Sequence, residues 1–230
     1  MADGPVFLIT GASSGIGAAT ARHAAAEGYR LVLAARTRQR LEELAAELGG
    51  GGRALAVECD VGEWDQQERM VARTIDAFGR IDVVFANAGF GARRGFTEET
   101  PEFWRSMVLT NVLGAAYTIR ATINALRKAK GHLILTSSVA GRRALPGSFY
   151  SATKHAVTAM GEAARQELSD SGVRLTVIEP GMVDTPFFDE GAPDWALKPD
   201  DVSRAIMFAV SQPPHVDVNE VLIRPTAGPG

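Results

Sequence analysis

The sequence has few of the residues from which disulfides, metal centres and membrane anchors are built. Cys59 is the only cysteine among 230 residues, which excludes an internal disulfide and argues against a zinc site made of thiolates. The four histidines, at positions 23, 132, 155 and 215, show no metal-ligand spacing. No apolar run approaches the roughly 20 residues that span a bilayer. We therefore expect neither a bound metal nor a membrane partner.

Neither sign of charge dominates. The formal net charge is −3 and the basic residues are scattered, so no basic stripe indicates a nucleic-acid partner. Residues 5–10 run directly into a glycine turn and lack the pattern of a signal peptide, so we expect a cytoplasmic protein. With 46% hydrophobic and 22% charged residues, the composition is typical of soluble globular proteins. These values predict one domain spanning residues 1–230.

Short β-type runs alternate with longer amphipathic patterns along the whole chain. This alternation predicts an α/β fold, a doubly wound, Rossmann-like sheet of seven parallel strands with helices on both faces. Runs such as Leu31–Ala35 are apolar throughout, as expected of strands buried on both sides. The segment 185–199 is irregular and predicts a substrate-binding loop or lid. The expected strands are 5–10, 30–35, 53–58, 82–86, 131–137, 173–179 and 219–224, and the expected helices are 15–28, 38–48, 64–78, 101–130, 148–171 and 199–211.

The stretch TGASSGIG at residues 10–17 fits two kinds of site. It contains G-x-S-x-G, the turn that exposes a nucleophilic serine in hydrolases, but no earlier strand loop is present to supply the oxyanion donor. A strand, a glycine turn and a helix also form a cradle for phosphate, although the spacing G-x-x-x-G-x-G differs from the standard dinucleotide fingerprint. An ordinary glycine-rich turn without a ligand is the alternative. The candidate phosphate-binding residues are Gly11, Ser13, Ser14, Gly15, Ile16 and Gly17.

The end of the second expected strand bears on the choice of cofactor. An acidic residue there accepts the ribose hydroxyl of NAD, whereas an arginine accommodates the additional phosphate of NADP. This chain has Arg36 at that point and no acid. Arg36 therefore favours NADP(H), because a guanidinium grips a phosphate bidentately. The alternative is that Arg36 and Arg38 are solvated residues at the start of a helix.

A second group of polar residues follows the fifth expected strand. Tyr150 and Lys154 are four residues apart at the start of a helix, so both can act on one ligand, and the chain has only three tyrosines and four lysines. Ser137 and Ser138 precede them. Ligands of open α/β sheets bind outside the carboxyl ends of the strands. Segments 87–89 and 180–181 end two further strands and should share this edge.

Together these motifs resemble the short-chain dehydrogenase/reductase family, in particular its single-domain, NADP(H)-preferring members. The resemblance rests on TGASSGIG, Asn87-Ala88-Gly89, Asn111 within LTNV, Ser138, Tyr150-x3-Lys154 and the segment PGMVDT at 180–185. It covers essentially the whole chain. Residues 186–198 match no family motif, and in this family that region usually determines substrate specificity. Where the family usually has Asn-Asn-Ala-Gly, this chain has Ala86 in place of the first asparagine.

The resemblance implies hydride transfer between NADP(H) and a carbonyl compound or secondary alcohol, as in a ketoreductase. Tyr150 would be the general acid/base, with its pKa lowered by the ammonium of Lys154. Ser138 would donate to the substrate oxygen. Asn111 would hold a water on a proton path, and Lys154 would also bind the nicotinamide ribose. Neighbouring strand residues face opposite ways, so only one of the two serines should reach the site. We prefer Ser138 to Ser137 because its spacing to Tyr150 fits the family better.

The resemblance also implies further cofactor contacts and an oligomer. Thr185 would contact the carboxamide and Asp60 the adenine, although a helix cap or turn role would explain both residues. In this family, helices corresponding to 101–130 and 148–171 commonly form a dimer face, so a homodimer or homotetramer is expected. The complete expected cofactor set is Gly11, Ser13, Ser14, Gly15, Ile16, Gly17, Arg36, Asp60, Val61, Asn87, Ala88, Gly89, Tyr150, Lys154, Pro180, Gly181, Val183 and Thr185.

The substrate is harder to infer from the sequence. Large apolar residues near the expected site predict an apolar cavity for a medium-sized carbonyl compound, or they simply pack the lid. The arginine pairs 93–94 and 142–143 either recognise a carboxylate or are solvated, and we infer no acidic substrate from the pairs alone. A non-catalytic NADPH sensor and an epimerase or dehydratase are the alternative functions. The apolar residues are Phe90, Phe149, Met182, Phe187, Phe188 and Trp195.

Overall fold

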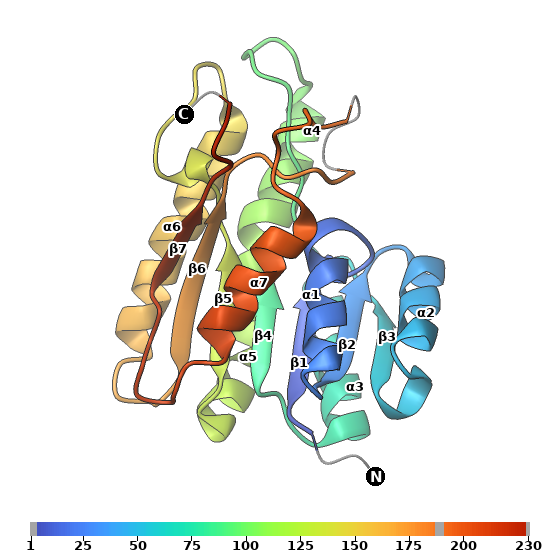
Figure 1. Cartoon of the computed structure of the whole chain (residues 1–230). Helices are drawn as coiled ribbons and strands as arrows, with labels where there is room; N and C mark the ends of the chain where they lie inside the picture. The colour runs from blue at the N-terminus through green and yellow to red at the C-terminus, as the bar shows by residue number, and fades with distance from the viewer. Residues whose placement is uncertain (1–3, 187–190, 229–230) are drawn as a thin grey trace.

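The strands of the protein form a parallel sheet in the order β3-β2-β1-β4-β5-β6-β7 (Figure 1). The structure is a computed structural model that describes residues 4–186 and 191–228. After β3 at one edge, the chain returns to place β4 beside β1, so the order reverses next to β1. This arrangement confirms the predicted doubly wound, Rossmann-like sheet. The strands are β1 Val6–Thr10, β2 Arg30–Ala35, β3 Ala54–Glu58, β4 Val83–Ala86, β5 His132–Thr136, β6 Arg174–Pro180 and β7 Glu220–Ile223.

Helices cover both faces of the sheet, and the side chains of β1 show why. Phe7 and Ile9 pack into one core with α1, α2 and α7, whereas Val6 and Leu8 pack into a second core with α3, α5 and α6. Because successive strand residues face opposite sides, a strand covered on both sides must be apolar throughout. The helices are α1 Gly15–Ala26, α2 Arg38–Glu47, α3 Trp64–Phe78, α4 Pro101–Met107, α5 Gly114–Ala129, α6 Phe149–Glu167 and α7 Pro199–Val210.

The predicted single helix over 101–130 is wrong in its details. Between α4 and α5 lies a π-helical segment, η2, at Val108–Leu113. Such a wide turn inserts an extra residue into the helix and is common at functional sites. Apolar periodicity does not reveal the insertion, because the pattern continues on both sides of it. Asn111, one of the predicted catalytic residues, lies within this segment. In addition, α6 ends at Glu167 rather than at Ser171.

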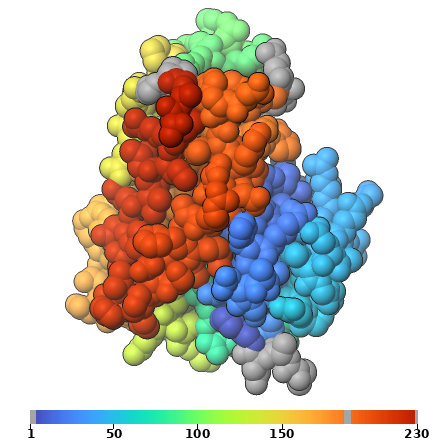
Figure 2. All heavy atoms as spheres, in the orientation of Figure 1, coloured from blue at the N-terminus to red at the C-terminus, as the bar shows by residue number. Residues whose placement is uncertain are grey.

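Helix α7 packs on α1, the helix that follows the glycine turn. In Figure 2 the atoms of α7, in orange, lie directly beside those of α1, in blue. The buried hydroxyl oxygens of Thr20 on α1 and Ser203 on α7 lie 3.1 Å apart.

No helix among residues 4–186 and 191–228 is long and apolar enough to cross a membrane.

The predicted lid has a defined base. Val183 and Leu197 form an isolated parallel bridge. The Asp184 N–H donates to the Leu197 carbonyl at 2.7 Å, and the Leu197 N–H donates to the Met182 carbonyl at 3.0 Å. The two ends of the irregular segment are therefore held together. Phe187 and Phe188, which we expected near the substrate, lie outside the described residues.

Candidate active site

A cavity of about 510 Å³ lies at the carboxyl ends of the central strands. Its lining brings together residues from all parts of the chain that carry the sequence motifs. Of the predicted site residues, Gly17 and Asn111 alone are absent from this lining within the described residues. The predicted residues that line it are Gly11, Ser13, Ser14, Gly15, Ile16, Arg36, Asp60, Val61, Asn87, Ala88, Gly89, Ser138, Tyr150, Lys154, Pro180, Gly181, Val183 and Thr185.

The glycine turn is suited to bind an anion. Gly11 and Gly15 have φ of 66° and 52°, a region that favours glycine. Ser14, the N-cap of α1, makes no side-chain cap hydrogen bond, and the first turn of α1 has no acidic residue. The first N–H groups of α1 thus have no capping side chain at the cavity edge. Free N–H groups and the positive helix end together favour a phosphate there.

Gly17 packs closely against the glycine turn that precedes it. A Cβ on Gly17 would lie 2.3 Å from the Gly11 carbonyl oxygen and 2.9 Å from Asn87 Nδ2. The start of α1 therefore packs against the turn itself. The crowding at Gly17 comes from the protein's own backbone and from Asn87, and the expected contact of Gly17 with the cofactor stays a prediction.

Asn87 joins three strand ends beneath the cavity. Its Nδ2 donates to the Thr10 carbonyl at 3.1 Å, and its Oδ1 accepts from Thr136 Oγ1 at 3.2 Å. The Asn87 N–H also donates to Thr10 Oγ1 at 3.0 Å. The ends of β1, β4 and β5 are thereby held in register. Thr10 and Thr136, each a hydroxyl residue that ends an apolar strand, were not among the predicted site residues.

The two arginines after β2 have different surroundings. Arg36 is exposed and lines the cavity beside Thr37. Arg38 instead forms an ion pair with Glu42 on the same helix, at 2.7 Å. Of this pair, Arg36 is therefore the guanidinium positioned for a ligand at this end of the cavity.

Asp60 and Val61 follow β3 and also line the cavity. Asp60 Oδ1 accepts from the Gly62 N–H at 2.9 Å, so Asp60 also serves as a turn residue. Val61 packs against the first residue of α5, since a Cβ on Gly114 would lie 2.6 Å from Val61 Cγ2. The turn role and the cavity position of Asp60 are thus compatible.

The two serines after β5 face opposite ways, as strand alternation predicts. Ser137 Oγ donates to the Lys154 carbonyl at 3.0 Å and lies 2.7 Å from Thr158 Oγ1, so it is bound to α6. Ser138 Oγ donates to the Pro180 carbonyl at 3.3 Å and accepts from the Ala140 N–H at 3.1 Å. Ser138 also shares a hydrogen bond with Tyr150. Ser138 is therefore the serine that meets the tyrosine.

Lys154 is buried beneath Tyr150. Its Nζ donates to the Thr136 carbonyl at 2.8 Å and lies 5.6 Å from the centre of the Tyr150 ring. Loss of hydration lowers the pKa of Lys154 to about 8, because burial penalises the ammonium form. A buried ammonium beside an aromatic ring is the cation that the Tyr-x-x-x-Lys spacing predicts.

The pKa of Tyr150 differs from our expectation. Burial raises it above the ordinary value of a tyrosine, and the hydrogen bond with Ser138 lowers it to a smaller extent. We predicted that Lys154 would lower this pKa. In this structure desolvation of the phenolate outweighs the other contributions, so Tyr150 is a protonated phenol at neutral pH.

Asn111 is held firmly at the back of the site. Its Oδ1 accepts from the Phe90 N–H at 3.0 Å, and its Nδ2 donates to the Phe90 carbonyl at 2.9 Å and to Thr153 Oγ1 at 3.2 Å. A Cβ on Gly89 would lie 3.1 Å from Asn111 Oδ1 and 3.6 Å from Lys154 Nζ. Asn111 and Lys154 therefore border the same glycine, and the π-helical turn of η2 brings Asn111 to that place.

A buried ion pair supports the segment that carries the two serines. Glu179 on β6 is fully buried, and Arg142 Nε donates to it at 2.6 Å. Arg142 also pairs with Glu220 on β7. Burial raises the pKa of Glu179, whereas Arg142 lowers it. Thr158 Oγ1 donates to Glu179 at 3.4 Å and so connects this pair to Ser137.

The predicted apolar residues divide into two groups. Phe90 and Met182 line the cavity. Phe149 instead stacks on Trp104, with ring centres 4.9 Å apart. The ring of Trp195 packs against Gly228, where a Cβ would lie 2.6 Å from it. Our expectation that Phe149 and Trp195 line the substrate cavity therefore finds no support within the described residues.

The sheet order and the glycine turn define a Rossmann-like α/β protein. Residues 5–194 match the family described as short chain dehydrogenase. An uncharacterized oxidoreductase from Staphylococcus saprophyticus is 38% identical over 228 residues, covering 96% of this chain and 97% of that protein. The chain belongs to the short-chain dehydrogenase/reductase family and is an oxidoreductase of that family.

Solved structures agree with this assignment. An alcohol dehydrogenase from Thermococcus sibiricus, complexed with 5-hydroxy-NADP, superposes with a TM-score of 0.92 at 34% identity and covers 98% of this chain and 99% of that one. Serine dehydrogenase from Escherichia coli has a TM-score of 0.86 at 31% identity, covering 95% and 96%. A 3-ketoacyl-(acyl-carrier-protein) reductase from Brucella melitensis, complexed with NADH, has a TM-score of 0.87 at 28% identity, covering 97% and 98%.

Proposed function

We propose that the protein is an NADP(H)-dependent oxidoreductase that interconverts a carbonyl compound and a secondary alcohol. The observation that carries this proposal is the convergence of Ser138, Tyr150 and Lys154 on the cavity that the glycine turn also lines. A bound nicotinamide would supply or accept the hydride. The remaining steps fall to side chains of this chain.

The side chains suit the reduction of a carbonyl group. Tyr150 is protonated at neutral pH because burial raises its pKa, and it is therefore ready to donate a proton to the oxygen that becomes an alcohol. Ser138 shares a hydrogen bond with Tyr150 and would hold the same substrate oxygen, stabilising the charge that develops there. Lys154, anchored on the Thr136 carbonyl, places a positive charge beneath the phenol.

The preference for NADP(H) rests on Arg36. Its guanidinium is exposed at the end of β2 and lines the cavity, and a bidentate pair with a phosphate is the strongest contact that it can make. Related structures contain both kinds of cofactor, since the Thermococcus sibiricus enzyme holds 5-hydroxy-NADP and the Brucella melitensis enzyme holds NADH.

The cofactor preference is tested by charge removal at two neighbouring positions. Arg36→Leu should lower the ratio of kcat/KM with NADPH to kcat/KM with NADH by roughly 10- to 100-fold, the usual range for a lost charge-assisted hydrogen bond. Arg38→Leu is the matched control, because Arg38 is paired with Glu42. A wild-type ratio at or below one contradicts the NADP(H) assignment.

The reaction is tested with a panel of ketones, aldehydes and alcohols, followed through nicotinamide absorbance. Tyr150→Phe should lower turnover by about a thousandfold or more while NADPH still binds, because general acid catalysis is lost. Tyr117→Phe is a matched control, since Tyr117 packs on Trp64 away from the cavity. Substantial turnover by Tyr150→Phe removes Tyr150 from the acid/base role. NADPH binding by the wild type without turnover of any compound indicates a cofactor sensor instead.

A further inference from the structure

The arginine pair 93–94 next to the cavity is divided by its contacts. Arg93 is engaged by its own loop, with Nε 3.2 Å from Glu99 Oε1 and Nη2 donating to the Glu98 carbonyl at 2.7 Å. Arg94 lines the cavity, and it forms no hydrogen bond or ion pair with any residue that the structure describes. Of these two adjacent arginines, Arg94 is therefore the one that lines the cavity and whose guanidinium has no partner among residues 4–186 and 191–228.

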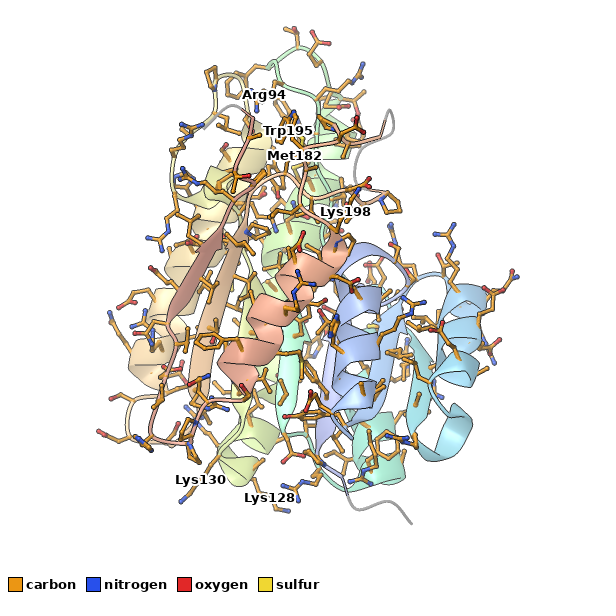
Figure 3. The ribbon with its side chains drawn as sticks, in the orientation of Figure 1. Arg94, Lys128, Lys130, Met182, Trp195 and Lys198 are labelled. Carbon is orange, nitrogen blue, oxygen red and sulfur yellow. The ribbon has the colours of Figure 1, made fainter. Side chains whose placement is uncertain are left out.

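Arg94 is held close to the start of the helix that carries Tyr150. The next residue, Gly95, donates its N–H to the Gly147 carbonyl at 2.8 Å, which ties the loop to the segment before α6. Ser148 caps α6 by accepting from the Ser151 N–H. In Figure 3, Arg94 lies with Met182 at the end of the molecule beyond the carboxyl ends of the strands. The loop that carries Arg94 therefore adjoins the start of α6, the helix that carries Tyr150.

The charges around the cavity favour an anion at this position. Within the described lining, Asp60 is the single acidic residue, and it follows β3 on the cofactor side together with Arg36. Lys154 is buried and bound to the Thr136 carbonyl. Arg94 is therefore the cation that remains for the substrate.

The apolar residues of the cavity indicate which part of the substrate joins its anionic group to the reacting carbon. The cavity that Arg94 lines also has apolar side chains in its wall, which suit a short aliphatic chain between the anion and the reacting carbon. A carboxylate suits a single guanidinium, because two parallel hydrogen bonds neutralise one charge. A phosphate ester would carry a charge of about −1.5 to −2 and leave part of it unpaired. The apolar lining residues are Phe90, Ala92, Leu145 and Met182.

We propose that Arg94 binds the carboxylate of the substrate, so that the enzyme acts on short hydroxy acids and the corresponding oxo acids. This inference rests on the proposed oxidoreductase function and adds the class of its substrate. A neutral analogue would leave the guanidinium without a partner, so the acid should be preferred. Removing the guanidinium should remove that preference.

The test compares an acid with its ester in three proteins. We would measure kcat/KM for α- and β-hydroxybutyrate, for γ-hydroxyvalerate and for their methyl esters, with NADP⁺, in the wild type, Arg94→Met and Arg93→Met. Arg93→Met removes the same charge one residue away. The ratio of acid to ester should fall about tenfold in Arg94→Met, as expected for one charge-assisted contact at a solvent-accessible position. The ratio should persist in Arg93→Met.

A binding measurement separates this inference from the reaction itself. Calorimetry with the NADP⁺ complex would compare butyrate with butyramide in the same three proteins. Without turnover of any hydroxy acid, ester or simple alcohol, the proposed reaction fails, yet tighter binding of butyrate that depends on Arg94 still supports the anion site. An acid-to-ester ratio at or below one for every chain length, or equal preference in wild type and Arg94→Met, overturns the role of Arg94. Equal binding of butyrate and butyramide does the same.

Discussion

A buried titratable group lies at each end of strand β5, and the two groups serve different purposes. At its start, His132 is buried, and desolvation lowers its pKa to about 3, with a further contribution from Arg174. Its Nε2 lies 2.7 Å from Thr176 Oγ1, which itself donates to the Val218 carbonyl, so Nε2 must be the donor. At the end of β5, the Thr136 carbonyl accepts from Lys154. Each end therefore has a buried base whose pKa burial lowers.

The difference between the two ends is access to a cavity. Lys154 lies beneath Tyr150 in the wall of the cavity, whereas His132 is enclosed by the sheet and Nδ1 of its ring has no partner among the described residues. A shifted pKa alone therefore does not identify a functional group. A functional group is identified by its position at the carboxyl ends of the strands, where ligands bind.

The largest effect on turnover is expected from Lys154→Met. It should lower kcat/KM by about a thousandfold, because the positive charge beneath the phenol is lost. Lys128→Met is a control, since Lys128 lies at the opposite end of the molecule (Figure 3). Turnover within tenfold of the wild type would contradict the role of Lys154.

The same variant has a pH signature in its stability. Between pH 8 and 10.5 the unfolded wild-type chain keeps its Lys154 proton while the folded chain releases it, so wild-type stability rises with pH in this interval. The free energy of unfolding of Lys154→Met relative to the wild type should therefore decline from about pH 8 to 10.5. Denaturant titrations at several pH values measure this difference, and a constant difference would show that Lys154 titrates normally.

Substitutions of the two serines that follow β5 should have different effects, one on catalysis and the other on stability. Ser138→Ala should lower kcat/KM by about a hundredfold, the usual effect of losing a hydrogen-bond donor to developing charge. Ser137→Ala should lower the free energy of unfolding by about 1 kcal/mol and change kcat/KM less, because Ser137 is bound to Lys154 and Thr158 on α6. Equal losses of kcat/KM in the two variants would contradict this division.

Arg142→Met should affect stability more than turnover. It leaves Glu179 buried without its cation, which should cost about 2 kcal/mol at neutral pH, less than for a fully buried pair because Arg142 is partly exposed. The folded-state pKa of Glu179 is raised above 4.5, so the penalty should shrink as the pH falls toward 4.5 and the carboxyl group binds a proton. Unfolding of the variant at neutral and mildly acidic pH tests this. A penalty that grows with acidification would exclude an ionised Glu179 as its cause.

The smallest effect on turnover is expected at the start of β5. His132→Gln should leave kcat/KM nearly unchanged, because His132 is remote from the cavity. In the wild type, the stability that depends on a neutral His132 is present above pH 6.5 and is lost as the pH falls toward about 3. The variant should therefore lose less stability than the wild type between these pH values. Parallel acid-unfolding curves would show that His132 does not contribute to acid lability.

Local signals predicted much of the architecture. The predicted bounds of β2 and α3 coincide with the structure, because a glycine or a polar turn borders an apolar or amphipathic run at each end. The π-helical turn at Asn111 was missed, since one inserted residue leaves the apolar pattern intact. The packing role of Gly17 was missed because it depends on the Gly11 carbonyl and on Asn87, which is remote in the sequence.

The sequence by itself determined the parallel sheet and the edge at which its chemistry is located. Apolar runs, glycine turns and amphipathic patterns specify the alternation of strands and helices locally. Parallel strands then bring their carboxyl ends together at one edge of the sheet. Tertiary structure decided which member of the arginine pair 93–94 meets the cavity, since Arg93 is bound within its own loop and Arg94 lines the cavity. It also decided that the pKa of Tyr150 rises, because burial of the phenol depends on how the folded chain packs around it, which the spacing of residues along the sequence does not specify.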